Sequence, residues 1–247
     1  VAWLVPTSRD PEAPKLDPLG LLLPTLTIGV IASALIEAPD AGWTSTQTLG
    51  LFAAGIVSLA AFIGWERRTP EPMLDVNIFR NLRFSAASLS VTVAFFALAG
   101  FIFLITQYFQ FLKGYGPLET GFRLLPVATS VAISSIVGTQ LAVRYGTKFI
   151  VGGGLVTLSV AYGWVSTSGV DTSYLEIACQ MILLGTGMGL TSAPATESIM
   201  GAVSNAKAGI GSAVNDTTRE RGGTLRVAVI GSVFASRYQD AFKVDSV

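Results

Sequence analysis

The residues of this chain that could do chemistry are concentrated in one otherwise apolar segment, residues 208–235. Within it, Asp216 and Arg219 lie three residues apart, so on a helix they share a face and can form an ion pair. Ionisable groups inside a membrane-spanning helix are candidates for proton transfer or ligand binding. A purely structural ion-pair network, or a helix broken at Gly222–Gly223, would explain the same residues.

A second polar group, Gln107, Tyr108 and Gln110, lies at the end of another apolar stretch. Gln107 and Gln110 are three residues apart, which places them on one face of an α-helix. Amide and phenol groups buried in a bilayer must bond to protein or face a cavity. Binding of a largely apolar solute and hydrogen bonding between helices explain this group equally well.

Glu197 follows Pro194 near the end of a third apolar stretch. It could exchange protons, or its carboxylate could simply reach the aqueous interface.

The composition excludes several kinds of chemistry. The chain has no histidine and a single cysteine, Cys179, which lies in an apolar stretch, so we expect neither a metal site nor a cofactor. A net charge of zero argues against a nucleic-acid partner. The glycine-rich runs 152–154 and 185–189 lack the strand that precedes a nucleotide-binding loop, so we assign them to close packing between helices.

The elements that must position these residues are long uncharged stretches separated by short polar breaks. A helix crosses a hydrocarbon layer of about 30 Å in roughly 20 residues. Six stretches meet this length: Pro18–Ile36, Ala41–Trp65, Phe84–Leu112, Leu124–Val143, Phe149–Val170 and Ile177–Thr196. The sequence therefore predicts an all-α, polytopic bundle in a lipid bilayer, with about seven transmembrane helices when Ala208–Ala235 is included.

The seventh segment differs from the other six in its charges. Each Asp, Lys or Arg at the bilayer centre costs about 2.5–3.5 kcal/mol, whereas an apolar residue returns only about 0.3–0.6 kcal/mol. We therefore expect this segment to need neighbouring helices or a hydrated cavity.

The distribution of cations orients the bundle. When the breaks are assigned alternately to the two sides, one side carries most of the Lys and Arg: Arg9, Lys15, Arg67, Arg68, Arg80, Arg83, Arg144, Lys148 and Lys207. The positive-inside rule makes this side cytoplasmic. Residues 66–83, with Pro70 and Pro72, form the longest break and separate the first two spans from the rest.

Several strings, taken together in this order, resemble the fourteen-helix drug/proton antiporters of the major facilitator superfamily. They are Glu66-Arg67-Arg68, Phe84-Ser85-Ala86-Ala87-Ser88-Leu89, Thr106-Gln107-Tyr108, Arg123-Leu124-Leu125-Pro126, Pro194-Ala195-Thr196, and Gly211 through Arg219. Gly138, Arg144, Gly146 and Lys148 resemble the loop motif of that superfamily, with Val143 where Asp is usual. The chain departs from the pattern at Glu220, Arg221, Thr224 and Arg226.

The resemblance implies an organisation and a function. Residues 1–17 would be the end of a preceding helix and a cytoplasmic loop, 18–65 a two-helix linker, 66–83 a cytoplasmic loop, and 84–247 an incomplete C-terminal half with five helices. The protein would not be an enzyme but part of a secondary transporter of the plasma membrane, exchanging protons for small hydrophobic or cationic compounds and requiring an N-terminal half as partner. Gln107, Tyr108, Gln110 and Asn215 would line its cavity.

Two other functions remain open. A receptor or assembly subunit without transport activity would share the same spans. A membrane-embedded enzyme would need a convergent set of acid, base and nucleophile, for which the charged segment is the sole candidate.

Overall fold

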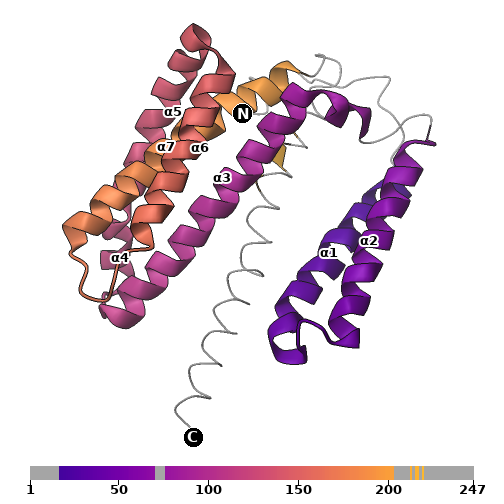
Figure 1. Ribbon diagram of the computed structural model, residues 1–247, viewed down its shortest axis with the longest axis horizontal. Coiled ribbons are helices and arrows are strands. Elements are labelled where there is room, and N and C mark those ends of the chain that lie inside the picture. The colour runs from indigo at the N-terminus through magenta and orange to yellow at the C-terminus, as the bar shows by residue number, and fades with distance from the viewer. Residues whose placement is uncertain (1–16, 70–75, 203–211, 213–214, 217–218, 220–247) are drawn as a thin grey trace, which may run out of the picture.

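The computed structural model describes residues 17–69 and 76–202, together with Ser212, Asn215, Asp216 and Arg219 (Figure 1). Regular structure in this part of the chain is helical. The elements are α1 (Pro18–Ala41), α2 (Thr46–Glu66), the 3-10 helix η1 (Val76–Arg80), α3 (Leu82–Gln107), the π-helix η2 (Tyr108–Leu112), α4 (Pro117–Arg123), α5 (Leu125–Tyr145), α6 (Thr147–Val165) and α7 (Tyr174–Gly201).

Six helical stretches among the described residues are long and apolar enough to cross a membrane, counting α3 with η2 and α4 with α5 as one each. The six predicted spans and the all-α class are therefore confirmed, and the protein is a multi-pass membrane protein. The seventh predicted span lies outside the described residues apart from Ser212, Asn215, Asp216 and Arg219, each of which is helical.

Helix ends differ from the predicted ones because caps, not charges, end these helices. The first span was predicted to end at Ile36, before Glu37, yet α1 continues to Ala41 and ends where Gly42 adopts a φ of 94°. The next helix begins at Thr46 instead of Ala41 because the Ser45 hydroxyl accepts a hydrogen bond from the Thr48 amide.

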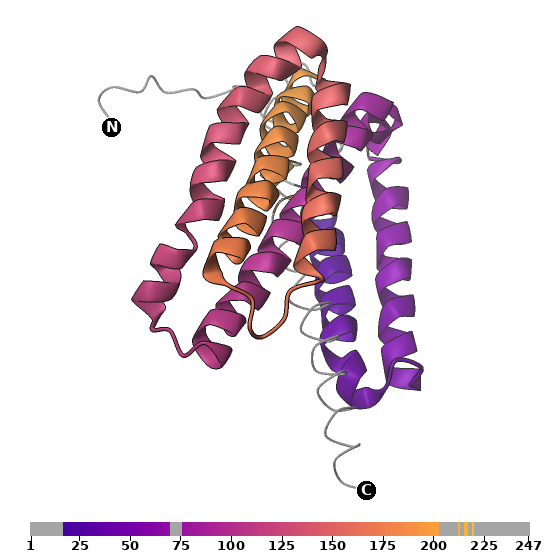
Figure 2. The same cartoon turned by 60° about the vertical axis from the view of Figure 1, so that its left-hand side comes forward.

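Helices α1 and α2 pack against each other as a hairpin, and α7 packs against α5, α6 and α3. In the view of Figure 2, α7 lies between α5 and α6. Half of the apolar stretch of α7 is buried, compared with at most 22% in the other five spans. Helix α7 is therefore the central element of the described bundle.

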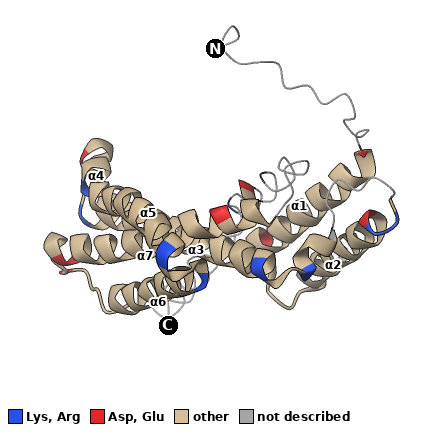
Figure 3. Cartoon of the chain, turned by 90° about the horizontal axis from the view of Figure 1, so that it is seen from above, with Lys and Arg blue, Asp and Glu red and all other residues tan. Residues whose placement is uncertain are grey.

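The ends of the helices reproduce the predicted asymmetry of charge. The breaks after α2, before α3 and between α5 and α6 lie at one end of the molecule and carry Arg67, Arg68, Arg80, Arg83, Arg144 and Lys148. Figure 3 shows these basic segments from above. At the opposite end lie Lys113 and Arg123. We refer to the first end as cytoplasmic and to the second as outer.

Glycines allow α7 to approach its neighbours at backbone distance. A methyl group on Gly187 would lie 2.8 Å from the carbonyl oxygen of Gly154, and one on Gly154 would lie 2.9 Å from that of Gly187. On the other side of α7, the Ser134 hydroxyl of α5 donates to the carbonyl oxygen of Gly185 at 3.1 Å. Both glycine runs thus contribute to close packing, although of the run 152–154 only Gly154 does so.

One carboxylate closes the cytoplasmic end of the α1–α2 hairpin. The Asp17 Oδ1 atom accepts hydrogen bonds from the amides of Leu19 and Gly20, at 3.1 and 3.0 Å, and Oδ2 accepts one from the Trp65 indole at 2.8 Å. The bond from the Gly20 amide, followed by that from Trp65, holds the pKa of Asp17 below its ordinary value of 3.8. The ionised form is therefore the one that holds the hairpin closed.

The packing of α6 on α7 predicts opposite effects for two adjacent glycines. Gly154→Ala should lower the thermal stability of the purified protein, by about 1–3 kcal/mol, because its methyl group meets backbone atoms of α7. Gly153→Ala should leave stability unchanged or raise it slightly, since nothing lies within 4 Å of its added methyl group. Equal losses in a thermal-unfolding assay in detergent would contradict this packing.

The Asp17 contacts predict a pH dependence. Because the pKa of Asp17 is lowered in the folded state, its stabilisation is present above pH 3.8 and is lost as the pH falls through the lowered value. Tryptophan fluorescence should change over that acidic range as Trp65 loses its acceptor. In Asp17→Asn this component should disappear, because the amide does not titrate there. Identical acid titrations of the two proteins would show that Asp17 does not control the contact.

Candidate functional site

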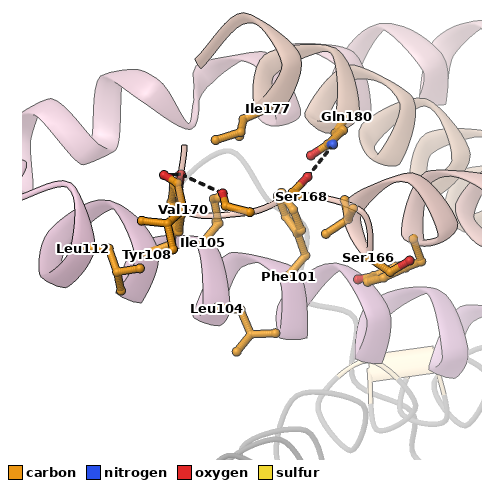
Figure 4. Close-up of a pocket in the computed structure, with 13 residues that line it drawn as sticks. Phe101, Leu104, Ile105, Tyr108, Leu112, Ser166, Ser168, Val170, Ile177 and Gln180 are labelled. Atoms are coloured by element: carbon orange, nitrogen blue, oxygen red, sulfur yellow. Dashed lines mark hydrogen bonds between the residues drawn. The ribbon is translucent and has the colours of Figure 1, made fainter. Parts of the chain in front are cut away.

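A cavity of about 440 Å³ lies at the outer end of the bundle, between α3 with η2, the end of α6, the α6–α7 loop and α7 (Figure 4). Its walls are mainly apolar and include Phe101, Leu104, Ile105 and Ile177. The Tyr108 hydroxyl donates to the carbonyl oxygen of Val170 at 3.0 Å, and the Gln180 amide nitrogen donates to the Ser168 hydroxyl at 2.7 Å. An apolar pocket with a few placed polar groups is the usual form of a small-molecule site.

The π-helix at the end of α3 decides which side chains reach this cavity. The Lys113 amide donates to the Tyr108 carbonyl, five residues earlier, at 3.1 Å. In such a turn, residues three apart no longer share a face as they do in an α-helix. Tyr108 lines the cavity, whereas the half-buried Gln107 and Gln110 are not among its lining residues.

Aromatic rings brace the outer end around Phe109, which is 1% exposed. The Arg123 guanidinium lies over the rings of Tyr115 and Tyr174, at 4.0 and 4.8 Å from their centroids, and pairs with Glu119 at 2.8 Å. These contacts join α4 to the start of α7. None of these residues lines the outer cavity, and the charge of Arg123 is already paired.

A second polar cluster lies deeper, where α3 faces α7. The Arg219 guanidinium donates to the Thr196 hydroxyl at 3.0 Å and lies 5.1 Å from the centroid of the Phe95 ring. Thr196 in turn donates to the Asn215 side-chain oxygen at 3.3 Å. The Arg219 Nε atom is buried and has no hydrogen-bond partner. Phe95 is about 20 Å along α3 from Leu82, whereas Thr196 is five residues, about 8 Å, from the cytoplasmic end of α7 at Gly201, so this cluster lies in the cytoplasmic half of the membrane.

The residues that the resemblance assigned to one cavity therefore lie in two places. Tyr108 lines the outer cavity, while Asn215, which is 6% exposed, belongs to the deeper cluster. Along α3 the two places are separated by the 13 residues from Phe95 to Tyr108, or about 20 Å.

The three charged candidates, Glu197, Asp216 and Arg219, are also arranged differently from what the sequence predicted. Among the described residues one ion pair is formed, between Glu119 and Arg123, so Asp216 and Arg219 are not joined. Asp216 and Glu197 are exposed, and Arg219 is half-buried. Arg219 bonds to a hydroxyl instead, because Thr196 lies where its side chain enters the bundle.

The four residues of the loop motif separate into two kinds. Gly138 lets α5 approach α7, since a methyl group there would lie 3.1 Å from the Leu190 Cα atom. Gly146, with φ +93°, makes the tight turn from α5 to α6. The exposed Arg144 lies over the Tyr145 ring, at 5.5 Å, and Lys148 is exposed in the first turn of α6.

Sequence reasoning missed the partners of these polar groups. Gln180 could have been noticed as an amide inside an apolar span, and Thr196 as the residue next to Glu197. Phe95 and Ser168 gave no signal, because nothing distinguishes them from other residues of their kind. Within the described residues no group of three or more His, Cys, Asp or Glu side chains could hold a metal ion.

Comparison with known proteins gives consistent matches. The model of the Major Facilitator Superfamily matches residues 19–225. The multidrug resistance protein Stp of Mycobacterium tuberculosis is 34% identical over 232 residues, which are 94% of this chain and 43% of that protein.

Two further relatives have a similar degree of likeness. The multidrug efflux pump LfrA of Mycolicibacterium smegmatis is 31% identical, over 96% of this chain and 47% of its own length. The tetracenomycin C resistance and export protein of Streptomyces glaucescens is 30% identical, over 95% and 44%. The chain thus spans less than half the length of each of these relatives.

The outer cavity predicts the effect of one hydroxyl group. Tyr108→Phe should lower stability by about 0.5–1.5 kcal/mol and speed hydrogen exchange in the α6–α7 loop, because the Val170 carbonyl loses its partner. Tyr115→Phe is the control, since it keeps the ring on which Arg123 stacks. Mass spectrometry measures the exchange. Equal exchange rates in the α6–α7 loop of the two variants would show that Tyr108 does not hold this loop in place.

Proposed function

Because this chain belongs to the major facilitator superfamily, as the match over residues 19–225 shows, we propose that it forms part of a secondary active transporter. The proposed activity is proton-coupled efflux of small hydrophobic or cationic compounds across the plasma membrane. The relatives named for multidrug resistance, multidrug efflux and drug export support this activity.

The observation that carries the proposal is the polar cluster between α3 and α7. A guanidinium within the apolar part of the membrane would be expelled from lipid, so Arg219 requires a hydrated or polar neighbourhood. Transporters of this superfamily bind substrates and coupling ions near the midplane. The cluster of Arg219, Thr196 and Asn215 extends toward that level from the cytoplasmic side, which suits this role.

We assign proton exchange to the two exposed carboxylates of this region, Asp216 and Glu197. Glu197 adjoins Thr196, and Asp216 adjoins Asn215, so each is next to a member of the hydrogen-bonded cluster. Protonation of either one changes the charge beside Arg219. A proton taken up there would therefore alter the electrostatic environment in which a substrate binds.

We propose the outer cavity as a second binding site for an apolar solute. Its few polar groups are neutral, and Tyr108 and Gln180 are already engaged in hydrogen bonds. A solute would hold its position there mainly by shape and by contact with apolar walls. Such a cavity favours breadth of substrates over selectivity for one.

The organisation into a two-helix linker, residues 18–65, and part of a transporter half, residues 84–247, also remains a proposal. It is supported by the packing of α1 against α2 and of α7 against α3, α5 and α6. Assignment to the fourteen-helix branch rests on the same division. Alternating access requires two halves, so we propose a second helical half of the same transporter as the partner of this chain.

Replacement of one carboxylate tests the proposal. In the complete transporter that includes this chain, produced in a drug-sensitive bacterium, Asp216→Asn should abolish proton-driven efflux of a lipophilic cationic dye. The amide cannot release a proton at physiological pH, while its size is nearly the same. Dye retention with and without a protonophore gives the measurement, and immunoblotting of membranes shows that the variant is inserted.

The matched control is Asp171→Asn, the same exchange in the outer α6–α7 loop, which should keep efflux. Unchanged efflux in Asp216→Asn would remove Asp216 from the mechanism. Absence of any dye efflux by the unmodified transporter, with any of several dyes of both charges, would contradict the proposed function itself.

A further inference from the structure

A cavity of about 830 Å³ opens at the cytoplasmic end of the bundle, between the first turns of α3 and of α6. It is separate from the outer cavity and from the arginine cluster, and its lining includes Gly146 and Lys148 of the loop motif. Two of its lining residues are cationic, Arg83 of α3 and Lys148 of α6. No carboxylate is among the lining residues that the structure describes, so the mouth of this cavity carries positive charge.

A hydrogen bond holds one of the two cations at this mouth, and the start of a helix adds to the charge of the other. The Arg83 Nε atom donates at 2.8 Å to the hydroxyl of Ser198, a residue of α7 that is 3% exposed. Lys148 lies in the first turn of α6, whose free backbone amides add positive partial charge. Charge from a side chain of α3, a side chain of α6 and the start of α6 thus converges on one opening.

Apart from Arg83 and Lys148, the cavity is lined mainly by apolar residues. It extends from Leu82 to Ser90 along α3 and from Thr147 to Leu155 along α6, about 12 Å on each helix. Small residues, Ala86, Ala87 and Gly152, leave the space open. Since the mouth lies at the cytoplasmic interface, this 12 Å depth runs from the headgroup level into the hydrocarbon layer.

We propose that this cavity binds an anionic phospholipid of the cytoplasmic leaflet. Its phosphate lies between Arg83 and Lys148, and the upper part of one acyl chain lies against α3 and α6. Basic pockets between transmembrane helices on the cytoplasmic side suit anionic headgroups. A soluble phosphate compound would use the two cations but would leave the apolar depth empty, so charge and shape together favour the lipid.

Binding can be measured on the purified chain in detergent by native mass spectrometry. Phosphatidylglycerol should bind more tightly than phosphatidylcholine with the same acyl chains. Arg83→Gln and Lys148→Gln should each weaken phosphatidylglycerol binding about fivefold and reduce its preference over phosphatidylcholine. Arg144→Gln removes a cation of the same loop that does not line the cavity, and it should change the affinity little.

The apolar depth is tested separately. Gly152→Leu adds a side chain to the lining of the cavity at a position where nothing lies within 4 Å of the new Cβ atom, and it should weaken lipid binding. Gly163→Leu is the matched control. Nothing lies within 4 Å of its new Cβ atom, Gly163 does not line the cavity, and lipid binding should stay unchanged. Inorganic phosphate at millimolar concentration should fail to displace the lipid.

Three results would overturn the proposal. The first is equal binding of the two lipids, and the second is an equal loss from Arg144→Gln. The third is full displacement by inorganic phosphate, which would show that the cations bind phosphate without regard to a lipid tail. Circular dichroism of each variant verifies that a loss of binding does not come from unfolding.

Discussion

The structure depends on the backbone-level packing of α7 against α5 and α6. Lipid chains are as apolar as the helices they surround, so helices in a membrane associate through close van der Waals contact and interhelical hydrogen bonds. Gly187 of α7 and Gly154 of α6 supply the contact, and Ser134 of α5 supplies a hydrogen bond to the Gly185 carbonyl. With α7 fixed in this way, one of its side chains anchors each polar region of the described bundle: Gln180 at the outer cavity, Thr196 at the arginine cluster and Ser198 at the cytoplasmic cavity.

Helix α3 contributes a side chain to each of the same three regions. Arg83 reaches Ser198, Phe95 lies under the guanidinium that Thr196 binds, and Tyr108 reaches the loop before α7. A sliding displacement of α3 along α7 would therefore change all three contacts together, as in a shear motion between packed helices. The π-helix that ends α3 interrupts the regular hydrogen-bond ladder where the outer contact is made. The outer cavity and the cytoplasmic cavity are thus both in contact with the same pair of helices.

Much of the fold could be predicted from the sequence, because hydrocarbon thickness sets the length of every uncharged stretch. Six spans followed from that length, and the positions of the cations predict their orientation. The local details could not be predicted, since they depend on short-range hydrogen bonds: Ser45 moves the start of α2, and a π-turn separates Gln107 from Gln110. The candidate residues were recognised by their polarity inside apolar stretches. The grouping of these residues could not be predicted, because tertiary packing alone places Tyr108 at the outer cavity and Asn215 in the arginine cluster.

The energetics of Arg219 bear on the transport cycle that we propose for the complete protein. A guanidinium costs about 2.5–3.5 kcal/mol at the bilayer centre, and this value bounds the cost for Arg219 in the cytoplasmic half. A hydrogen bond from a charged group contributes about 1.5–3 kcal/mol, and a cation–π contact about 0.5–2 kcal/mol. The Thr196 hydroxyl and the Phe95 ring therefore offset the cost almost fully, but without a large surplus. If α3 moves away from α7, one contact is lost and the arginine is no longer compensated. In the mechanism that we propose, a proton leaving a nearby carboxylate, or an entering solute, then determines which arrangement of the two helices is the more stable.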